Sequence, residues 1–175
     1  GGCSAGADGR RGTGGGLGAW GHGDDRCAGG WPGVQCGGGV VTGLTLVSEP
    51  ALTGDVGTLS TLPRLAHLDV HGTKVTGSIG QLSGASSLSY LDQHGTKVSG
   101  GIGTLSDQHT LAYIDLAATD VTGEVGALST LPQLAHLDVD GTTVPGGVGA
   151  LAAISALVYL DVAGTAATGL PLPTT

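Results

Sequence analysis

The sequence predicts a solenoid, a mostly β repeat fold in which successive copies of one short unit stack along an axis. Three observations support this prediction. A unit of 23 residues recurs without a change of phase, glycine (36 residues) with threonine, valine and leucine dominates the composition, and signals for α-helices are scarce. At 175 residues, the chain is long enough to bury a core as one domain.

The repeating unit is plainest between residues 65 and 156. LAHLDVHGTKVTGSIGQLSGASS (65–87) is followed by LSYLDQHGTKVSGGIGTLSDQHT, LAYIDLAATDVTGEVGALSTLPQ and LAHLDVDGTTVPGGVGALAAISA. A variant one residue longer precedes them (41–64), and a truncated copy starts at residue 157. The shared frame, L-x-x-L-x-L-x-x-T-x-V-x-G-x-I-x-x-L-x-x-L, is that of a leucine-rich repeat.

Each copy of the repeat predicts a short strand, a turn and a return segment. In the copy at 65–87, the side chains expected to point inward are those of Leu68, Val70, Val75, Ile79 and Leu82. No copy can bury this apolar side alone, so the core must come from stacked neighbours. Glycine after each T-x-V-[T/S] run marks unusual backbone angles or close packing (Gly77, Gly100, Gly123).

The run L-x-G-x-I in the second half of each copy resembles the plant-type, extracellular subclass of leucine-rich repeats, found in receptor-kinase ectodomains and polygalacturonase-inhibiting proteins. Trp20, Cys27 and WPGVQC (31–36) resemble the cap that precedes the first repeat in that family. The resemblance implies an α/β-type repeat fold, mostly β: a right-handed curved solenoid of about six 23–24-residue repeats. It also implies that Cys27 and Cys36 form a disulfide in the N-terminal cap, and paired cysteines persist in oxidising compartments.

Four segments follow from this comparison of sequence patterns. Residues 1–19 are glycine-rich, and glycine disfavours helix by about 1 kcal/mol per residue, so we expect this segment to be poorly ordered. Residues 20–40 form the cap, residues 41–170 the solenoid, and residues 171–175 a tail. Cys3 is left over, as a free thiol or as the partner of a cysteine outside the chain.

The repeats depart from the family pattern in two places. Threonine replaces the family's asparagine ladder, and its hydroxyl is expected to take over part of the turn hydrogen bonding (Thr73, Thr96, Thr119, Thr142, Thr165). Gln93 and Gln108 occupy slots that are apolar in other copies, and Ala85 underfills one of these slots. Buried amides without partners cost about 1–3 kcal/mol each. Either they bond backbone groups or residues 85–110 form a soft seam, and we favour a water-bridged network.

Strand alternation places a second set of side chains on the exposed, concave face of the predicted sheet. Three registers run along it: His67, Tyr90, Tyr113, His136 and Tyr159; then Asp69, Asp92, Asp115, Asp138 and Asp161; then His71 and His94, followed by Ala117, Asp140 and Ala163. Neighbouring carboxylates repel by about 1 kcal/mol per pair in a water-like dielectric, so the row favours a partner with Lys or Arg, or a hydroxyl-rich glycan. This surface is the predicted partner-binding site, and plain cover of the sheet is the alternative.

The same registers raise the question of a metal site. His67, Asp69, His71, Asp92 and His94 carry imidazoles and carboxylates that suit a transition metal. However, strand side chains stand parallel rather than converging, and no H-E-x-x-H motif is present. We therefore expect no metal and no other cofactor.

A second surface competes with the concave face. The residue after each valine points outward beside the turn and usually carries a hydroxyl: Thr53, Thr76, Ser99, Thr122 and Thr168. Regular threonine arrays on β-solenoids resemble ice-binding surfaces, although Pro145, Lys74 and Lys97 interrupt this one.

Charge and motifs exclude several functions. A net charge of −8 argues against nucleic-acid binding, and the most apolar run (151–160) is too short to span a bilayer. Nucleophile motifs are absent, so we expect no enzyme activity. The prediction is a secreted, extracellular or lumenal binding module for a protein, a peptide or a cell-wall glycan. The alternatives are a structural subunit of a larger assembly, docked through its uncapped C-terminal end, and ice binding through the threonine side.

Overall fold

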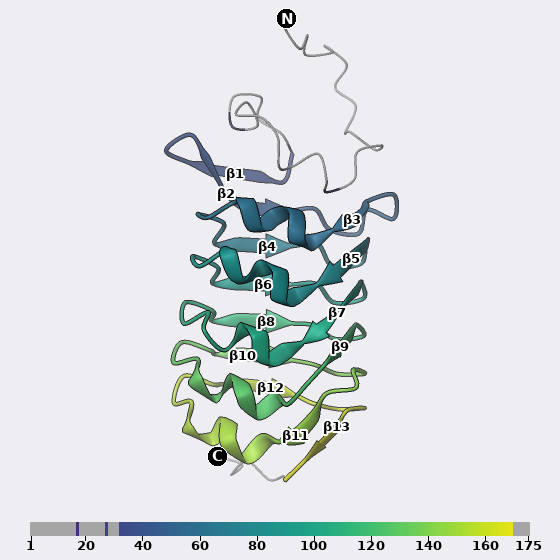
Figure 1. Cartoon of the computed structure of the whole chain (residues 1–175), viewed down its shortest axis with the longest axis vertical. Helices are drawn as coiled ribbons and strands as arrows, with labels where there is room; N and C mark the ends of the chain where they lie inside the picture. The colour runs from purple at the N-terminus through teal and green to yellow at the C-terminus, as the bar shows by residue number, and fades with distance from the viewer. Residues whose placement is uncertain (1–16, 18–26, 28–31, 170–175) are drawn as a thin grey trace, which may run out of the picture.

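The chain winds into a stack of similar coils that extends from β1 to β13 (Figure 1). This computed structural model describes Leu17, Cys27 and residues 32–169. Each full coil contributes a strand to a large sheet on one side, a 3-10 helix on the opposite side, and a second short strand between them. The predicted solenoid of stacked repeats is confirmed.

The large sheet has seven strands in the order β1-β2-β4-β6-β8-β10-β12. Their bounds are β1 Val34–Gly37, β2 Val40–Thr45, β4 His67–Asp69, β6 Tyr90–Asp92, β8 Tyr113–Asp115, β10 His136–Asp138 and β12 Tyr159–Asp161. β1 pairs antiparallel with β2, and all later pairs are parallel. Because each residue faces its counterpart one repeat later, as Asp69 faces Asp92, the registers of the sequence become straight rows across the sheet.

A second set of strands runs beside the turns. β3 (Thr53–Asp55), β5 (Lys74–Ser78), β7 (Lys97–Gly101) and β9 (Asp120–Thr122) form a four-stranded sheet, and β11 (Pro145–Gly147) pairs with β13 (Ala166–Thr168). The two sheets are separate, and the break falls beside Pro145, which has no N–H to donate to a ladder.

The return segments are 3-10 helices: η2 (Val56–Thr61), η3 (Ile79–Gly84), η4 (Ile102–Leu105), η5 (Val125–Thr130) and η6 (Val148–Ala153). The I-x-x-L part of the repeat explains them, because residues three apart lie on one side of a helix with three residues per turn. Ile79 and Leu82 are both fully buried in this way. Every helix in the described part falls short of the length and apolarity needed to cross a bilayer.

One continuous core runs through the stack. The five side chains predicted to point inward in the copy at 65–87 all have 0% exposure. The threonine ladder is also confirmed, since the hydroxyls of Thr73, Thr96, Thr119, Thr142 and Thr165 donate to the carbonyl three residues earlier at 2.6–2.7 Å. Each such bond closes a turn between a large-sheet strand and the strand that follows it.

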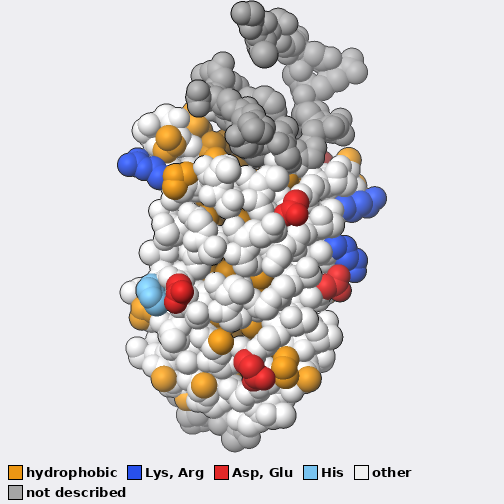
Figure 2. All heavy atoms as spheres, in the orientation of Figure 1, with side chains coloured by type: hydrophobic (Ala, Val, Ile, Leu, Met, Phe, Trp, Pro, Cys, Tyr) orange, Lys and Arg blue, Asp and Glu red, His pale blue; other side chains and the backbone are white. Residues whose placement is uncertain are grey.

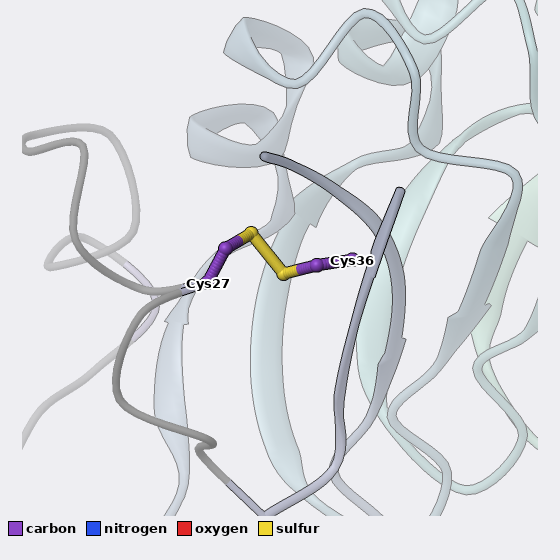
Figure 3. Close-up of a disulfide and its surroundings, with 2 residues drawn as sticks. All are labelled: Cys27 and Cys36. Atoms are coloured by element: carbon purple, nitrogen blue, oxygen red, sulfur yellow. A yellow bond between two sulfur atoms is a disulfide. The ribbon is translucent and has the colours of Figure 1, made fainter. Parts of the chain in front are cut away.

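The N-terminal end of the core is held by two contacts. Cys27 and Cys36 form the expected disulfide, with an S–S distance of 2.02 Å, which ties the segment before β1 to β1 itself (Figure 3). Leu17 is fully buried, and its carbonyl accepts a hydrogen bond from the Thr58 hydroxyl at 3.2 Å. Leu17 is thus part of the core, and the poor order expected for residues 1–19 stays a prediction. The rest of that segment, Cys3, Trp20 and the tail at 171–175 lie outside the described residues.

The two core glutamines behave differently. Gln108 donates from Nε2 to the Leu82 carbonyl at 3.2 Å, which agrees with the alternative that the buried amides bond backbone groups. Its Oε1, however, has no hydrogen-bond partner among the described residues. Gln93 has 0% exposure, and neither atom of its amide has such a partner. The core beside β6 thus contains the Gln93 amide, where the neighbouring coils have the apolar Val70 and Leu116.

Candidate functional site

The predicted binding residues form two straight rows on the outer face of the large sheet. The first residue of β4, β6, β8, β10 and β12 is His67, Tyr90, Tyr113, His136 or Tyr159, and the third is an aspartate. His71 and His94 follow two residues after β4 and β6. These twelve residues, which all belong to the predicted site, are called the polar strip.

The aromatic row is a continuous stack of five rings. Successive centroids are 4.2 Å apart from His67 through to Tyr159, and the angles between ring planes fall from 19° to 4°. Parallel strands impose this spacing, because each ring stands directly beside its counterpart on the next strand. The ring faces therefore cover one another, and the phenol hydroxyls and ring edges are left for outside contacts.

The aspartate row has a structural role that the sequence interpretation missed. Each carboxylate accepts the backbone N–H of the residue two positions later: those of His71, His94, Ala117, Asp140 and Ala163, at 2.9–3.3 Å. Such bonds let aspartate end a strand and begin a turn. The signal was present in the sequence, because an aspartate stands at the end of each predicted strand, just before the turn.

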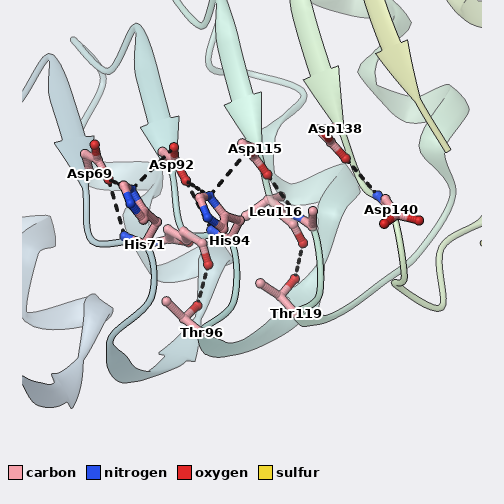
Figure 4. A network of polar contacts seen from close by, with 12 residues as sticks. Asp69, His71, Asp92, His94, Thr96, Asp115, Leu116, Thr119, Asp138 and Asp140 are labelled. Carbon is pink, nitrogen blue, oxygen red and sulfur yellow. Dashed lines mark hydrogen bonds and ion pairs between the residues drawn. The ribbon is translucent and has the colours of Figure 1, made fainter. Parts of the chain in front are cut away.

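Imidazoles alternate with carboxylates in the first half of the strip (Figure 4). Nδ1 of His71 lies 2.7 Å from Asp69 Oδ1 and 3.8 Å from Asp92 Oδ2. Nδ1 of His94 lies 2.8 Å from Asp92 Oδ1 and 3.5 Å from Asp115 Oδ2. The two imidazole rings stack at 4.4 Å.

The second half of the strip lacks this alternation. The positions that correspond to His71 and His94 are held by Ala117, Asp140 and Ala163, which offer no imidazole. The Tyr159 hydroxyl donates to Asp138 Oδ2 at 3.4 Å. The strip thus pairs carboxylates with imidazoles near β4 and β6, whereas near β10 and β12 it carries an added carboxylate, Asp140, at the corresponding position.

Burial and crowding shift the ionisation of several strip residues. Burial is the main cause that raises the pKa of the Asp115 carboxyl, and the charges of Asp92 and Asp138 raise it further. The hydrogen bond from the Ala117 N–H lowers this pKa but does not cancel the rise. Burial is also the main cause that raises the phenol pKa of Tyr90 and Tyr113, whereas Asp138 is the main cause for Tyr159. The phenols therefore remain protonated hydrogen-bond donors well into the alkaline range.

This shift predicts a loss of stability in alkaline solution. The folded-state pKa of Tyr113 is raised above the value of about 10 in the unfolded chain. The contribution of its neutral phenol to the free energy of unfolding is therefore complete below pH 10 and is lost as the pH rises further. Tyr113→Phe should make the fall in unfolding free energy between pH 9 and 11 shallower than in the wild type. Urea unfolding followed by circular dichroism at each pH measures this slope. Equal slopes would show that Tyr113 ionises as freely in the folded chain as in the unfolded one.

The threonine side is present but less regular. Thr53, Thr76, Ser99, Thr122 and Thr168 are all exposed on the small sheets. The hydroxyls of Thr76, Ser99 and Thr122 reach the carbonyl of the preceding coil only at 3.3–3.5 Å. The row is broken where the small sheets separate at Pro145.

The face that carries the 3-10 helices shows no aligned polar rows in Figure 2. Figure 2 shows backbone and uncharged polar side chains over most of it, with acidic, basic, histidine and hydrophobic groups scattered singly or in small groups. On this face, no aligned rows like those of the polar strip are apparent. The polar strip is therefore the strongest candidate site in the described part of the chain.

No protein-family model matches the sequence, and no protein with a curated description does either. Among solved structures, the ectodomain of the Arabidopsis thaliana receptor kinase SOBIR1 is similar with a TM-score of 0.73 and 24% identity, covering 82% of this chain and 85% of that one. The A. thaliana BIR3–SERK2 complex matches with a TM-score of 0.68 and 27% identity, over 82% and 79%. The Arabidopsis HAESA ectodomain, solved with an N-terminally extended IDA peptide hormone, matches with a TM-score of 0.69 and 20% identity, over 79% of this chain and 24% of that one.

Proposed function

Because the chain has the fold of plant-type leucine-rich-repeat ectodomains, we propose that it is a non-catalytic module that binds a protein or peptide ligand through the polar strip. The observation that supports this proposal most strongly is the strip itself. A row of five stacked rings lies beside a row of five aspartates on one face. Tyrosine is enriched where proteins recognise one another, because it offers a large area and a hydroxyl at small entropic cost.

The solved neighbours agree with a binding role. The HAESA ectodomain was solved with a peptide hormone, and this chain matches 24% of that receptor's length. The likeness therefore concerns one portion of such a receptor, and the ligand of this chain has to follow from its own surface.

The orientation of the rings favours a protein or peptide over a cell-wall glycan. A sugar ring packs best on an open aromatic face, and in the strip the inner faces are covered at 4.2 Å by the neighbouring rings. What remains exposed is a line of hydroxyls and ring edges, beside which the aspartates lie buried at Asp69 and Asp92 and half-buried at Asp115, Asp138 and Asp161. A segment with backbone N–H groups, or with Lys and Arg side chains, can pair with that line.

The disulfide bears on where the protein works. Cys27 and Cys36 are joined, and such bonds persist in oxidising compartments. We propose a secreted, extracellular or lumenal location, in which the strip meets its ligand outside the cytosol. Immunodetection of the protein in the extracellular fluid of its source would test this proposal, and detection in the cytosol alone would contradict it.

Affinity capture with three baits tests the binding site. The baits are the unaltered chain, a strip variant (Tyr90→Ala with Tyr113→Ala) and a threonine-side variant (Thr76→Ala with Thr122→Ala), each checked for folding by circular dichroism. We expect a partner from the native source that the strip variant loses and the other two baits retain. Recovery of the same partners with both variants would contradict the role of the strip.

Two other functions have specific support. The exposed threonine row on the small sheets favours ice binding, which an ice-recrystallisation assay tests directly. In the last described coil, Val158 is 86% exposed and Tyr159 is 42% exposed, which favours a docking surface of a larger assembly. A partner that survives in the strip variant but is lost from a Val158→Ser variant would favour this second function.

A further inference from the structure

Two imidazoles and one carboxylate on the polar strip come close enough together to share an ion. Ligand atoms of His71, Asp92 and His94 all lie within 4.8 Å of one another. We propose that these three residues bind a divalent transition metal ion, with Zn²⁺ as the reference ion. The three residues belong to the polar strip, but metal binding by them does not require the proposed protein or peptide ligand.

The donor set and its spacing support a metal of this class. Imidazole nitrogen suits zinc, copper, nickel and iron, and carboxylate oxygen can complete the set. With Zn–N and Zn–O bonds of about 2.0–2.2 Å, tetrahedral ligand atoms lie roughly 3.3 Å apart. The spacings to the two oxygens of the shared carboxylate, 2.8 Å from His94 Nδ1 to Asp92 Oδ1 and 3.8 Å from His71 Nδ1 to Asp92 Oδ2, lie on either side of that value.

Parallel strand side chains, as the sequence predicts them, count against a shared metal ion. The His71 and His94 rings are nearly parallel, at 11°, but both turn the same nitrogen toward the aspartate row. Their side chains are 28% and 42% exposed, so each ring has room to rotate toward the other. Rotation of both rings, which would separate their 4.4 Å stack, would turn the two nitrogens toward an ion beside Asp92.

The backbone beneath the two imidazoles is already fixed. The His71 carbonyl accepts the Ser48 N–H, and the His94 carbonyl accepts the Gly72 N–H, each at 2.9 Å. Both histidines therefore sit on rungs of the ladder between successive coils. Only side-chain rotation has to be ordered when the ion binds, which lowers the entropic cost of binding.

The surrounding charge also favours a cation. The carboxylates of Asp69, Asp92 and Asp115 flank the two imidazoles, with side-chain exposures of only 12%, 7% and 14%. Water screens their mutual repulsion poorly at such low exposure. A dication between the histidines would offset this repulsion.

A second group on the strip provides an internal comparison. Asp115, His136 and Asp138 also lie within 4.8 Å of one another, but they supply one imidazole. That ring lies between Tyr113 and Tyr159, at 4.2 Å on each side, so turning it would break two ring contacts, whereas His71 and His94 share a single one. His136 is therefore a matched control, since it is an imidazole on the same face that should not contribute.

The test is calorimetric titration of the whole chain with ZnCl₂, in a Cys3→Ser background that removes the thiol. We expect binding that weakens at least tenfold in His71→Ala and in His94→Ala, and stays within twofold in His136→Ala. Alanine stands at the equivalent positions 117 and 163, so the fold accommodates the first two changes. Melting temperature provides a second readout, since Zn²⁺ should raise it in the wild type and in His136→Ala but not in the His71→Ala, His94→Ala double variant.

Three results would overturn the proposal. They are no measurable binding at 1 mM ZnCl₂, unchanged affinity in the double variant, or equal affinity for Ca²⁺. The last would assign the ion to carboxylate oxygens alone, because Ca²⁺ takes oxygen ligands.

Discussion

Replacing Gln93 with leucine should raise the free energy of unfolding by about 2–4 kcal/mol, because a buried amide without partners costs about 1–3 kcal/mol and a buried leucine adds hydrophobic stabilisation. Gln93 has 0% exposure, and neither amide atom has a partner among the described residues. Leu116 fills the equivalent slot in the next coil with 0% exposure, so the slot accepts a leucine. For a chain of this size, the gain corresponds to an increase in melting temperature of roughly 5–12 °C.

Urea unfolding followed by circular dichroism measures the change at Gln93, and Gln133→Leu is the matched control. Gln133 is exposed at the end of the copy at 111–133, so its replacement should alter stability by less than about 0.5 kcal/mol. A loss of stability in Gln93→Leu would show that the amide is hydrogen-bonded within the native protein. It would also support the water-bridged network favoured from the sequence.

Replacing Gly77 with alanine should have an effect of similar size in the opposite direction. Gly77 has φ of +105°, and a Cβ there would collide with the Asp55 carboxylate. That carboxylate accepts the Gly57 N–H at 2.7 Å and caps η2. Backbone strain of about 1–3 kcal/mol and a weakened cap of about 0.5–2 kcal/mol together predict a loss of roughly 2–4 kcal/mol.

Gly149→Ala is the control for this second change. Gly149 lies within η6, its φ is not positive, and a Cβ there would meet nothing within 4 Å. Alanine should be neutral or slightly stabilising at that position. If urea unfolding gives the same midpoint for Gly77→Ala and Gly149→Ala, the prediction of a tight contact between neighbouring coils at Gly77 is wrong.

Much of the fold followed from the period of the sequence. Parallel strands pair in register, so a constant repeat of 23 residues determined which side chains would share a row. The inward positions of Leu68 and Val70 and the hydroxyl role of Thr73 followed from single copies. The pairing of Cys27 with Cys36 came from family resemblance rather than from spacing.

Other features depend on contacts between coils that a linear pattern does not contain. The three-residue spacing of Ile79 and Leu82 is compatible with the 3-10 form of the return segments, but a short apolar pattern of this kind does not by itself distinguish a helix from a strand. The separation of the small sheets depends on the N–H that Pro145 lacks. The distances between His71, His94 and Asp92 depend on side-chain rotamers, so the sequence could name these three residues but could not show whether they meet.

The central claim is that the polar strip binds the ligand, and the most direct measurement is a calorimetric titration of the captured partner into purified variants. Truncating two interface tyrosines should weaken binding by at least about thirtyfold, since one such residue at a hot spot contributes about 2 kcal/mol or more. The claim predicts this loss for Tyr90→Ala with Tyr113→Ala and an unchanged affinity for Thr76→Ala with Thr122→Ala. Unchanged affinity in the tyrosine variant, with a loss in the threonine variant, would contradict it and move the binding surface to the small sheets.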